Sequence, residues 1–338
     1  MTISWVAASA PGRICLAGEN LDWMTGGRSV VTSISLRTYA TFSRSGPPDS
    51  LIMRSLSPFY MSRRVPLEEL RIYLGDELDY IQASAKVVDD LLPSAPGGTV
   101  SVRTELPVRS GVSSSAALTL AVVGALLAAN DVRPDTEIIR NLAHSAESDE
   151  LRTGAGWMDF LACGEGGVGE VVSSNPPRFC RISNRLSPAI ILIDTGHRST
   201  SEILRLQRSR WVRNDPDISA YAEEAETVAG QLIQAIREVG IADTSVTRLI
   251  QRAHGLLRDR LHCTTPLIDR CVDICLQSGS YAAKLSGCGH GGCVFALVPE
   301  RHVPRVVTAI TPLPVQIFET ASDETGFSWG DAGSRRTD

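Results

Sequence analysis

A run of serines between an extended segment and an apolar helical segment holds the side chains best suited to chemistry. Residues 107–117 read Pro-Val-Arg-Ser-Gly-Val-Ser-Ser-Ser-Ala-Ala, between an expected strand over 99–105 and an expected helix over 115–129. A turn of Gly and Ser at a helix N-terminus leaves backbone N–H groups without intrahelical acceptors, at the positive end of the helix dipole. Such a terminus binds phosphate, and Ser hydroxyls are hard oxygen ligands that Mg²⁺ accepts. The run predicts a nucleotide-phosphate loop; the alternative is an N-capped helix after an ordinary turn.

A second candidate segment, residues 10–23, surrounds a short apolar strand with the charged side chains of Arg13, Glu19 and Asp22. Glycines at both ends of this strand would let the backbone approach a ligand closely. A carboxylate accepts hydrogen bonds from hydroxyl groups, and a guanidinium donates them to phosphate, so an Asp beside an Arg can hold a polyol and a phosphate together. The segment predicts part of a ligand site, and the alternative is a strand and turn with a surface ion pair.

A third segment, residues 284–293, reads Lys-Leu-Ser-Gly-Cys-Gly-His-Gly-Gly-Cys and contains a formal G-x-G-x-x-G. A dinucleotide-binding fingerprint requires a strand before the glycines and a helix after them, whereas here an apolar strand follows at 293–299. The chain also lacks the Walker sequence G-x-x-x-x-G-K-[ST] and the H-R-D and D-F-G motifs of protein kinases. We therefore expect a glycine loop that supports the site from a second lobe.

Composition excludes several classes of protein. A chain of 338 residues predicts two compact domains or one large one. A net charge of -5 provides no basic excess for nucleic acid, so no nucleic-acid partner is expected. No apolar run reaches the ~18 residues of a membrane span, and no signal peptide is recognisable, so no membrane partner is expected. The eight cysteines lack C-x-x-C spacing, which favours reduced thiols in a cytoplasmic protein.

Hydrophobic periodicity predicts mixed strands and helices in two lobes. In the first part we expect strands over 3–7, 14–17, 30–35 and 38–43, then helices over 78–92, 115–129 and 135–151. In the second part we expect a strand over 189–194, and helices over 199–212, 217–239, 245–261 and 266–278. Strands over 282–285 and 293–299, a helix over 304–311 and a strand over 314–320 follow. The residues after 321 read as a polar tail.

Taken in order, the three segments resemble the three motifs of the GHMP small-molecule kinases. The central family motif, P-x-x-x-G-L-G-S-S-A-A, matches Pro107 to Ala117 except at Val112 and Ser113. The first segment resembles the galactokinase signature G-R-x-N-L-I-G-E-H-x-D-Y, and mevalonate-type kinases carry Lys for Arg and lack the Asp. The third resembles K-L-T-G-A-G-G-G-G-C, with Cys288 and His290 as departures. The resemblance is to a galactokinase-like, sugar-1-kinase branch of this family.

The resemblance implies an α+β fold of two lobes, a ribosomal-protein-S5-domain-2-like N-terminal lobe and a ferredoxin-like C-terminal lobe. The implied domains are an ATP-binding domain over 1–185, a C-terminal domain over 186–325 and a polar tail over 326–338. It also implies ATP as co-substrate and Mg²⁺ as cofactor, acting in a monomer or homodimer.

The same resemblance assigns site residues. Residues 146–147 and 156–159 resemble the galactokinase pattern A-E-H…G-I-M-D-Q, which makes Asp159 the carboxylate facing the substrate hydroxyl and Arg13 its catalytic partner. Mg²⁺ would be held by Ser115 and Glu147. The implied ATP-binding residues are Pro107, Gly111, Val112, Ser113, Ser114, Ser115 and Ala116. The implied substrate-binding residues are Glu19, Asn20, Asp22, Gly156, Gly289 and Arg198.

The implied reaction is ATP-dependent phosphorylation of the anomeric hydroxyl of an aldose. Cys15, Asn20, Trp23 and Phe160 depart from the galactokinase pattern, which favours an aldose other than galactose. A heptose or larger sugar that already carries a distal phosphate would suit Arg198 of the 194–200 loop and the arginines that follow the loop, which are Arg205, Arg208 and Arg210. A solvated helix face is the alternative for these arginines. The other candidate functions are a mevalonate- or homoserine-type kinase of a non-sugar alcohol and a catalytically silent sugar-sensing module.

Overall fold

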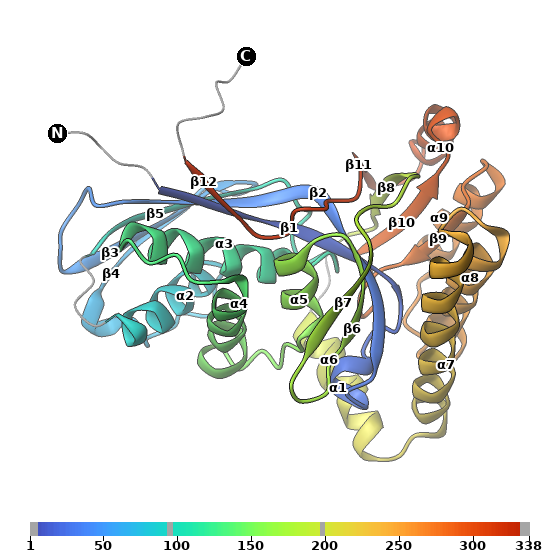
Figure 1. Cartoon of the computed structure of the whole chain (residues 1–338), viewed down its shortest axis with the longest axis horizontal. Coiled ribbons are helices and arrows are strands. Elements are labelled where there is room, and N and C mark those ends of the chain that lie inside the picture. Colours follow the sequence, from blue (N-terminus) through green and yellow to red (C-terminus); the bar gives the residue numbers. More distant parts are fainter. Residues whose placement is uncertain (1–5, 93–96, 197–199, 332–338) are drawn as a thin grey trace.

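The N-terminal lobe is built on a mixed sheet of eight strands (Figure 1), in a computed structural model that describes residues 6–92, 97–196 and 200–331. The strands are β1 (Val6–Ala17), β2 (Arg28–Ser43), β3 (Ser50–Ser57), β4 (Met61–Pro66), β5 (Gly98–Thr104), β6 (Val168–Val172), β7 (Arg178–Ser183) and β12 (Ser328–Asp331). Their order is β12-β1-β2-β5-β3-β4, with β6 paired to β2 and β7 to β6. Among these pairings only β3 with β5 is parallel. The long β1–β2 pair forms the centre of the lobe and carries Arg13.

One helix, α3 (Ser114–Ala129), is buried against β1 and β2. Its residues are apolar on nearly every side, as expected for a helix enclosed within a lobe. The other helical elements of this lobe are α1 (Leu21–Met24), a 3₁₀ turn (Leu67–Glu69), α2 (Leu78–Leu91), α4 (Thr136–Ser145), a π-helical turn (Ala146–Glu150) and α5 (Met158–Glu165). Because α2, α4 and α5 all pack on α3, the N-terminus of α3 is fixed in a rigid setting.

The C-terminal lobe is a four-stranded antiparallel sheet with helices, at the opposite end of the molecule from β3 and β4 (Figure 1). The strand order is β11 (Gln316–Thr320), β8 (Ala189–Asp194), β10 (Cys293–Val298), β9 (Ala282–Leu285). The helical elements are α6 (Thr200–Val212), α7 (Pro216–Val239), α8 (Thr244–Asp259), α9 (Pro266–Gln277), a 3₁₀ turn (Glu300–His302) and α10 (Val303–Ile310). Side-chain caps start three of the helices, since Asp215, Asp243 and Thr265 accept hydrogen bonds from the first-turn N–H groups of α7, α8 and α9.

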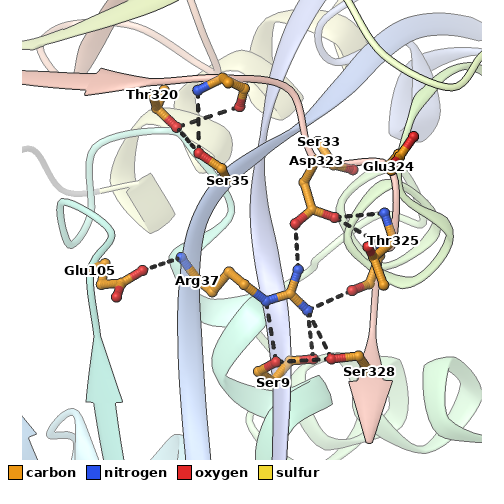
Figure 2. A network of polar contacts seen from close by, with 12 residues as sticks. Ser9, Ser33, Ser35, Arg37, Glu105, Thr320, Asp323, Glu324, Thr325 and Ser328 are labelled. Atoms are coloured by element: carbon orange, nitrogen blue, oxygen red, sulfur yellow. Dashed lines mark hydrogen bonds and ion pairs between the residues drawn. The ribbon is translucent and has the colours of Figure 1, made fainter. Parts of the chain in front are cut away.

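After β11 the chain returns to the N-terminal lobe, where residues 321–331 form a strap along β1. Figure 2 shows Arg37 of β2 holding this strap. Arg37 Nη1 meets Asp323 Oδ2 at 2.5 Å, and Nη2 donates to the Gly326 carbonyl at 2.6 Å. Beyond this clasp, β12 pairs with β1, and the Phe327 side chain is only 7% exposed. The expected polar tail over 326–338 is therefore wrong for residues 326–331, because Phe327 and Trp329 supply the apolar contacts that dock the segment; residues 332–338 lie outside the described part of the chain.

The expected α+β, two-lobed fold is confirmed, with four differences in detail. The strands expected over 3–7 and 14–17 form one continuous strand in the described residues, as do those over 30–35 and 38–43. The hairpins β3–β4 and β6–β7 were not predicted. The single helix expected over 135–151 is divided by the π-helical turn. The expected elements between 189 and 320 are present, most with ends within about two residues, and the boundary expected at 185/186 falls between β7 and β8.

Candidate active site

A cleft of about 1030 Å³ brings together parts of all three sequence segments. It is lined by the end of β1 and the turn after it, by the serine loop before α3, and by the approach to α5. The C-terminal lobe contributes α6 and the tip of the glycine loop at Gly287 and Cys288. A single site formed by segments so distant in sequence is the arrangement that the resemblance implied.

The serine loop has the backbone shape of an anion-binding nest. Arg109, Gly111 and Ser113 all have positive φ values, of 58°, 80° and 62°. Two of these are non-glycine residues in the left-handed region, a conformation that costs energy and gathers at functional sites. Left-handed residues that alternate with others turn successive N–H groups toward one concave face, and α3 begins directly after them. The loop can therefore hold phosphate oxygens with backbone donors and the helix dipole.

The residues implied for ATP binding divide into two groups in the structure. Gly111, Ser113, Ser114 and Ser115 line the cleft. Pro107, Val112 and Ala116 lie beneath the loop and are buried, the last two at 0% and 1% exposure. The Val112 carbonyl accepts a hydrogen bond from the Arg13 backbone N–H at 3.1 Å, so the buried group fixes the loop to β1.

Arg13 and Asp159 form a tight ion pair where the cleft meets the serine loop. Asp159 Oδ1 accepts from Arg13 Nε at 2.9 Å and from Nη2 at 2.6 Å, while Nη1 donates to the Gly111 carbonyl at 2.6 Å. The Arg13 side chain is 4% exposed and that of Asp159 is 31% exposed. Burial by itself would lower the pKa of Arg13, but the charge and hydrogen bonds of Asp159, together with Cys15 and Cys163, raise the pKa above its ordinary value. Arg13 is thus a permanent cation, and Asp159 keeps an accessible face.

Glu147 lies on the π-helical turn after α4, and such turns recur at functional sites. Its side chain is buried, and Thr119 Oγ1 donates to Glu147 Oε1 at 3.4 Å. Burial, and then the charge of Asp159, raise the pKa of Glu147 to about 8, while bonds from Ser115 and Thr119 lower it. A buried carboxylate with hydroxyl partners and no cation fits a hard divalent cation. No three His, Cys, Asp or Glu side chains cluster as a metal site in the described chain, so phosphate oxygens would have to complete the coordination.

The turn after β1 places polar side chains on the cleft wall. Asn20 Oδ1 accepts from Trp23 Nε1 at 3.1 Å, whereas Asn20 Nδ2 is buried with no hydrogen-bond partner among the described residues. Burial, and then the Asp159 charge, raise the pKa of Asp22 to about 6. Gly156 lies against the Asp22 carboxylate, so closely that a side chain at Gly156 would overlap it. An unused amide donor and a carboxylate that both line the cleft suit a ligand with neighbouring hydroxyl groups.

Helix α6 brings Arg205 and Arg208 to the opposite wall, and neither has a carboxylate partner among the described ion pairs. Arg208 Nη2 donates to the Gly154 carbonyl at 2.7 Å, and its guanidinium lies 5.3 Å from the centre of the Trp23 ring. Arg208 Nε is buried and lacks a hydrogen-bond partner within the described ranges. Arg205 also lines the cleft, whereas Arg210 pairs with Asp215 at 3.0 Å and does not line it. Arg198, also implied for substrate binding, lies outside the described residues.

Two implied substrate residues occupy positions that the sequence did not predict. Glu19 lines the cleft but is only 1% exposed; its Oε1 pairs with Lys284 of β9, and its Oε2 has no hydrogen-bond partner among the described residues. Gly289 does not line the cleft; it packs on Cys263, and a side chain there would overlap the Cys263 carbonyl. Gly287 and Cys288 take the cleft positions instead, because the left-handed Gly289 turns the loop inward toward Cys263.

Sequence reasoning missed several supporting side chains. Lys284 and Ser286 were visible in the third motif but received no role, and the rarity of lysine in the chain was the available signal. His144 stacks on Trp157 with ring centres 3.8 Å apart and braces the segment that enters α5. Burial lowers the pKa of His144, so it is a neutral brace. No sequence pattern announced this contact, because it depends on how α4 and α5 pack.

Two family sequence models match the chain. The one described as "GHMP kinases N terminal domain" matches residues 79–167, and the one described as "GHMP kinases C terminal" matches residues 230–312. The first range covers the serine loop, Glu147 and Asp159, and the second covers the glycine loop.

Similar proteins carry the names of two kinds of kinase. A mevalonate kinase of Thermococcus onnurineus is 27% identical over 320 residues, which cover 90% of this chain and 92% of the relative. A galactokinase of Mycobacterium bovis is 27% identical over 352 residues, covering 92% of this chain and 93% of the relative. The crystal structure of Lactococcus lactis galactokinase complexed with galactose matches the fold with a TM-score of 0.81 at 20% identity, over 96% of this chain and 95% of that one.

Proposed function

We propose, from the premise that the chain belongs to the GHMP kinase family and is an ATP-dependent phosphotransferase, that it phosphorylates the anomeric hydroxyl of an aldose. One observation carries the proposal. The Arg13–Asp159 pair lies between the serine loop and the wall that holds Asn20 and Asp22. A phosphate donor on one side and a polyol on the other would meet at that pair.

In this proposal the chain's own residues position the reactants and compensate charge, which are the main requirements of phosphoryl transfer. The N–H groups of the serine loop hold the triphosphate, and Arg13 donates to the oxygens that gain charge during transfer. Asp159 accepts or orients the proton of the attacking hydroxyl through its exposed carboxylate face. Glu147 and Ser115 would hold Mg²⁺, which when bound neutralises charge on the ATP phosphates.

The acceptor is proposed to be a sugar because hydroxyl-binding groups line its side of the cleft. Asn20 Nδ2 offers a donor and Asp22 an acceptor, a combination that fits two adjacent hydroxyl groups. Trp23 provides an apolar face beside them, such as sugar rings pack against. Arg205 and Arg208 have no carboxylate partner among the described ion pairs, and they support the finer proposal of a heptose or larger sugar with a distal phosphate.

A mevalonate-type activity is the second candidate, because the Thermococcus relative has that name and matches the chain equally well. Mevalonate is a small hydroxy acid, and its carboxylate could use the same arginines. The Asp22 carboxylate favours a polyol at its part of the cleft, because it can accept hydrogen bonds from hydroxyl groups and would repel a carboxylate placed there.

The test is a screen of acceptors with MgATP and detection of ADP. The panel contains free aldoses, aldoses with a terminal phosphate, and mevalonate, and ³¹P NMR locates the new phosphoryl group. We expect turnover of an aldose or aldose phosphate with a product phosphorylated at C1, and turnover at least about a hundredfold slower with Asp159→Asn. If mevalonate alone is phosphorylated, the sugar proposal is overturned. If no member of the panel supports turnover of ATP, both candidates are overturned.

A further inference from the structure

Lys284 is a fully buried cation at the junction of the two lobes. It lies on β9 of the C-terminal sheet, is 0% exposed and is one of two lysines in the chain. Its ammonium group pairs with Glu19 Oε1 and donates to the carbonyls of Leu285 at 2.8 Å and Cys15 at 3.3 Å. An ammonium has three donors, and all three are used here. Lys284 therefore connects its own strand to the end of β1 and to the turn that follows β1.

Ser286 contacts the same residue of β1, Cys15, at its backbone N–H. Its Oγ accepts from the Cys15 backbone N–H at 3.3 Å and donates to the Gly111 carbonyl at 3.1 Å. The Arg13 guanidinium reaches the same two oxygens, with Nη1 at 3.5 Å from Ser286 Oγ and 2.6 Å from the Gly111 carbonyl. The N–H and C=O of Cys15 are thus both fixed by residues two apart on the C-terminal lobe.

The segment held in this way carries groups from both sides of the proposed reaction. Arg13 lies two residues before Cys15 on β1, and Asp22 follows Glu19 by three residues in the turn. A further C-terminal group, the Tyr221 hydroxyl of α7, donates to the Glu19 carbonyl at 2.7 Å. We propose that Lys284 and Glu19 form an interlobe pin that fixes the segment from Arg13 to Asp22, and that Lys284 is a positioning residue for phosphoryl transfer. The catalytic part of this role rests on the proposed function.

Stability alone does not account for a charged pair at this position. Removing two charges from water is costly, and apolar replacements of buried pairs are often neutral or stabilising. What the ammonium supplies is three short contacts at one point, which no apolar side chain reproduces. A neutral replacement of the pair should therefore restore the fold without restoring the exact placement of Arg13 and Asp22.

The test uses Lys284→Met, Glu19→Gln and the double variant in the full-length protein, with Lys86→Met of α2 as the matched lysine control. Three measurements are made on each: Tm, binding of the non-hydrolysable analogue MgAMP-PNP by calorimetry, and hydrogen exchange of the peptide covering residues 13–22. Steady-state kinetics with the acceptor found in the screen follows.

We expect each single variant to lower Tm, because each leaves one buried charge unpaired. The double variant should regain most of the Tm and bind MgAMP-PNP within about twofold of the wild type. It should still exchange at least tenfold faster over 13–22 and lose at least tenfold in kcat, with KM for ATP unchanged. Ser286→Ala, which removes no charge, should also speed exchange over 13–22 and lower kcat, by smaller factors. This variant keeps the test decisive if the single variants of Lys284 and Glu19 fail to fold.

Recovery of wild-type exchange together with Tm in the double variant would overturn the pin. A Glu19→Gln variant with normal Tm and exchange but a raised acceptor KM would instead make Glu19 a direct substrate contact, which also overturns it. Hydrogen exchange and nucleotide binding need no acceptor. Failure of the pin is therefore visible even if the proposed sugar kinase activity fails.

Discussion

At the scale of single residues, the hydrogen bonds of the Asp159 carboxylate indicate how it could accept a proton from the substrate hydroxyl. Both short contacts with Arg13 fall on Oδ1, at 2.9 and 2.6 Å. The side chain remains 31% exposed, so the carboxylate keeps a face toward the cleft. A carboxylate held by one oxygen can receive a hydroxyl proton with the other, without moving.

We predict that Asp159→Asn retains MgAMP-PNP binding but lowers kcat by at least about two orders of magnitude, the usual contribution of a positioned acid–base group. Calorimetry and steady-state kinetics measure the two effects separately. Asp149→Asn is the control, since the Asp149 carboxylate accepts side-chain hydrogen bonds only from the neighbouring Ser145 and Ser148 within the described part of the chain and does not line the cleft. Turnover near that of the wild type in Asp159→Asn would remove this residue from the reaction.

The raised pKa of Glu147 links metal binding, pH and stability. With a folded pKa of about 8, above its ordinary value, Glu147 is protonated in the folded protein at neutral pH but ionised after unfolding. The folded state then binds more protons, so the contribution of Glu147 to stability falls as pH rises from about 4.5 to about 8. Occupation by a cation would reverse this penalty, because the cation stabilises the ionised form.

We predict that Glu147→Gln without metal raises Tm relative to the wild type, by a few degrees at pH 8 and by little at pH 5. The same change should raise the Mg²⁺ concentration needed for half-maximal activity at least about tenfold, because a charged oxygen ligand is lost. Thermal melts across pH and a Mg²⁺ titration measure the two effects. An unchanged Mg²⁺ titration would mean that another carboxylate holds the metal.

At the scale of elements, sequence patterns predicted what repeats along the chain and missed what depends on distant partners. Helices such as α7 and α9 have apolar stripes and capping residues, so periodicity located them well. The hairpin β3–β4 was missed because β4 is an edge strand with alternating exposure and two arginines. The π-helical turn was missed because local sequence does not distinguish it from an α-helix.

Site residues divide in the same way, into those that local motifs predicted and those that depend on distant partners. The serine loop, Arg13 and Asp159 lie in compact motifs, and the structure brings them together. The Glu19–Lys284 pair joins residues 265 apart in the chain, so no local pattern revealed it. The substrate role of Glu19 stays a prediction, since Glu19 lines the cleft, but its buried pairing with Lys284 could not be seen from its neighbours in sequence.

Helix α6 is the element that should distinguish a phosphorylated acceptor from a neutral one. If the acceptor has a distal phosphate, Arg205→Ala and Arg208→Ala should each raise its KM about ten- to a hundredfold and change kcat little. A contact made equally in ground and transition states has this effect, at ~1.5–3 kcal/mol for a charge-assisted bond.

The matched control for α6 is Arg213→Ala, since Arg213 bonds to Ser209 at 2.5 Å and does not line the cleft. Kinetics on the phosphorylated sugar and on the free sugar form the two arms. Equal turnover of both sugars, with both alanine variants unimpaired, would mean that these arginines belong to a solvated helix face and bind no phosphate. The protein would then be a 1-kinase of an aldose without a distal phosphate.

At the scale of the whole molecule, β1 is held at two places besides its pairing with β2, one at the site and one along its N-terminal half. The first is the contact of Lys284 and Ser286 with Cys15, and the second is the strap that Arg37 holds (Figure 2). Because both connections act on β1, the strand that carries Arg13 is supported from its two ends. The cleft is therefore built on a strand of the N-terminal lobe that also receives contacts from Lys284 and Ser286 of the C-terminal lobe.

The clasp of the strap gives a prediction on global stability. Asp323 and Arg37 are each 11% exposed, and Asp323 Oδ1 also accepts from the N–H groups of Thr325 and Gly326, both at 2.9 Å. Asp323→Asn can keep those two bonds but leaves the buried Arg37 without a counter-charge, which typically costs about 3 kcal/mol. Urea unfolding should show this loss, whereas Asp259→Asn, which breaks the exposed pair with Arg258, should change stability by less than ~1 kcal/mol.

Hydrogen exchange should localise the loss to β12 and the first half of β1, since these strands pair there. Equal unfolding curves for the two variants would mean that Phe327 and strand pairing hold the strap without the ion pair, and Phe327→Ala would then be the variant that releases it.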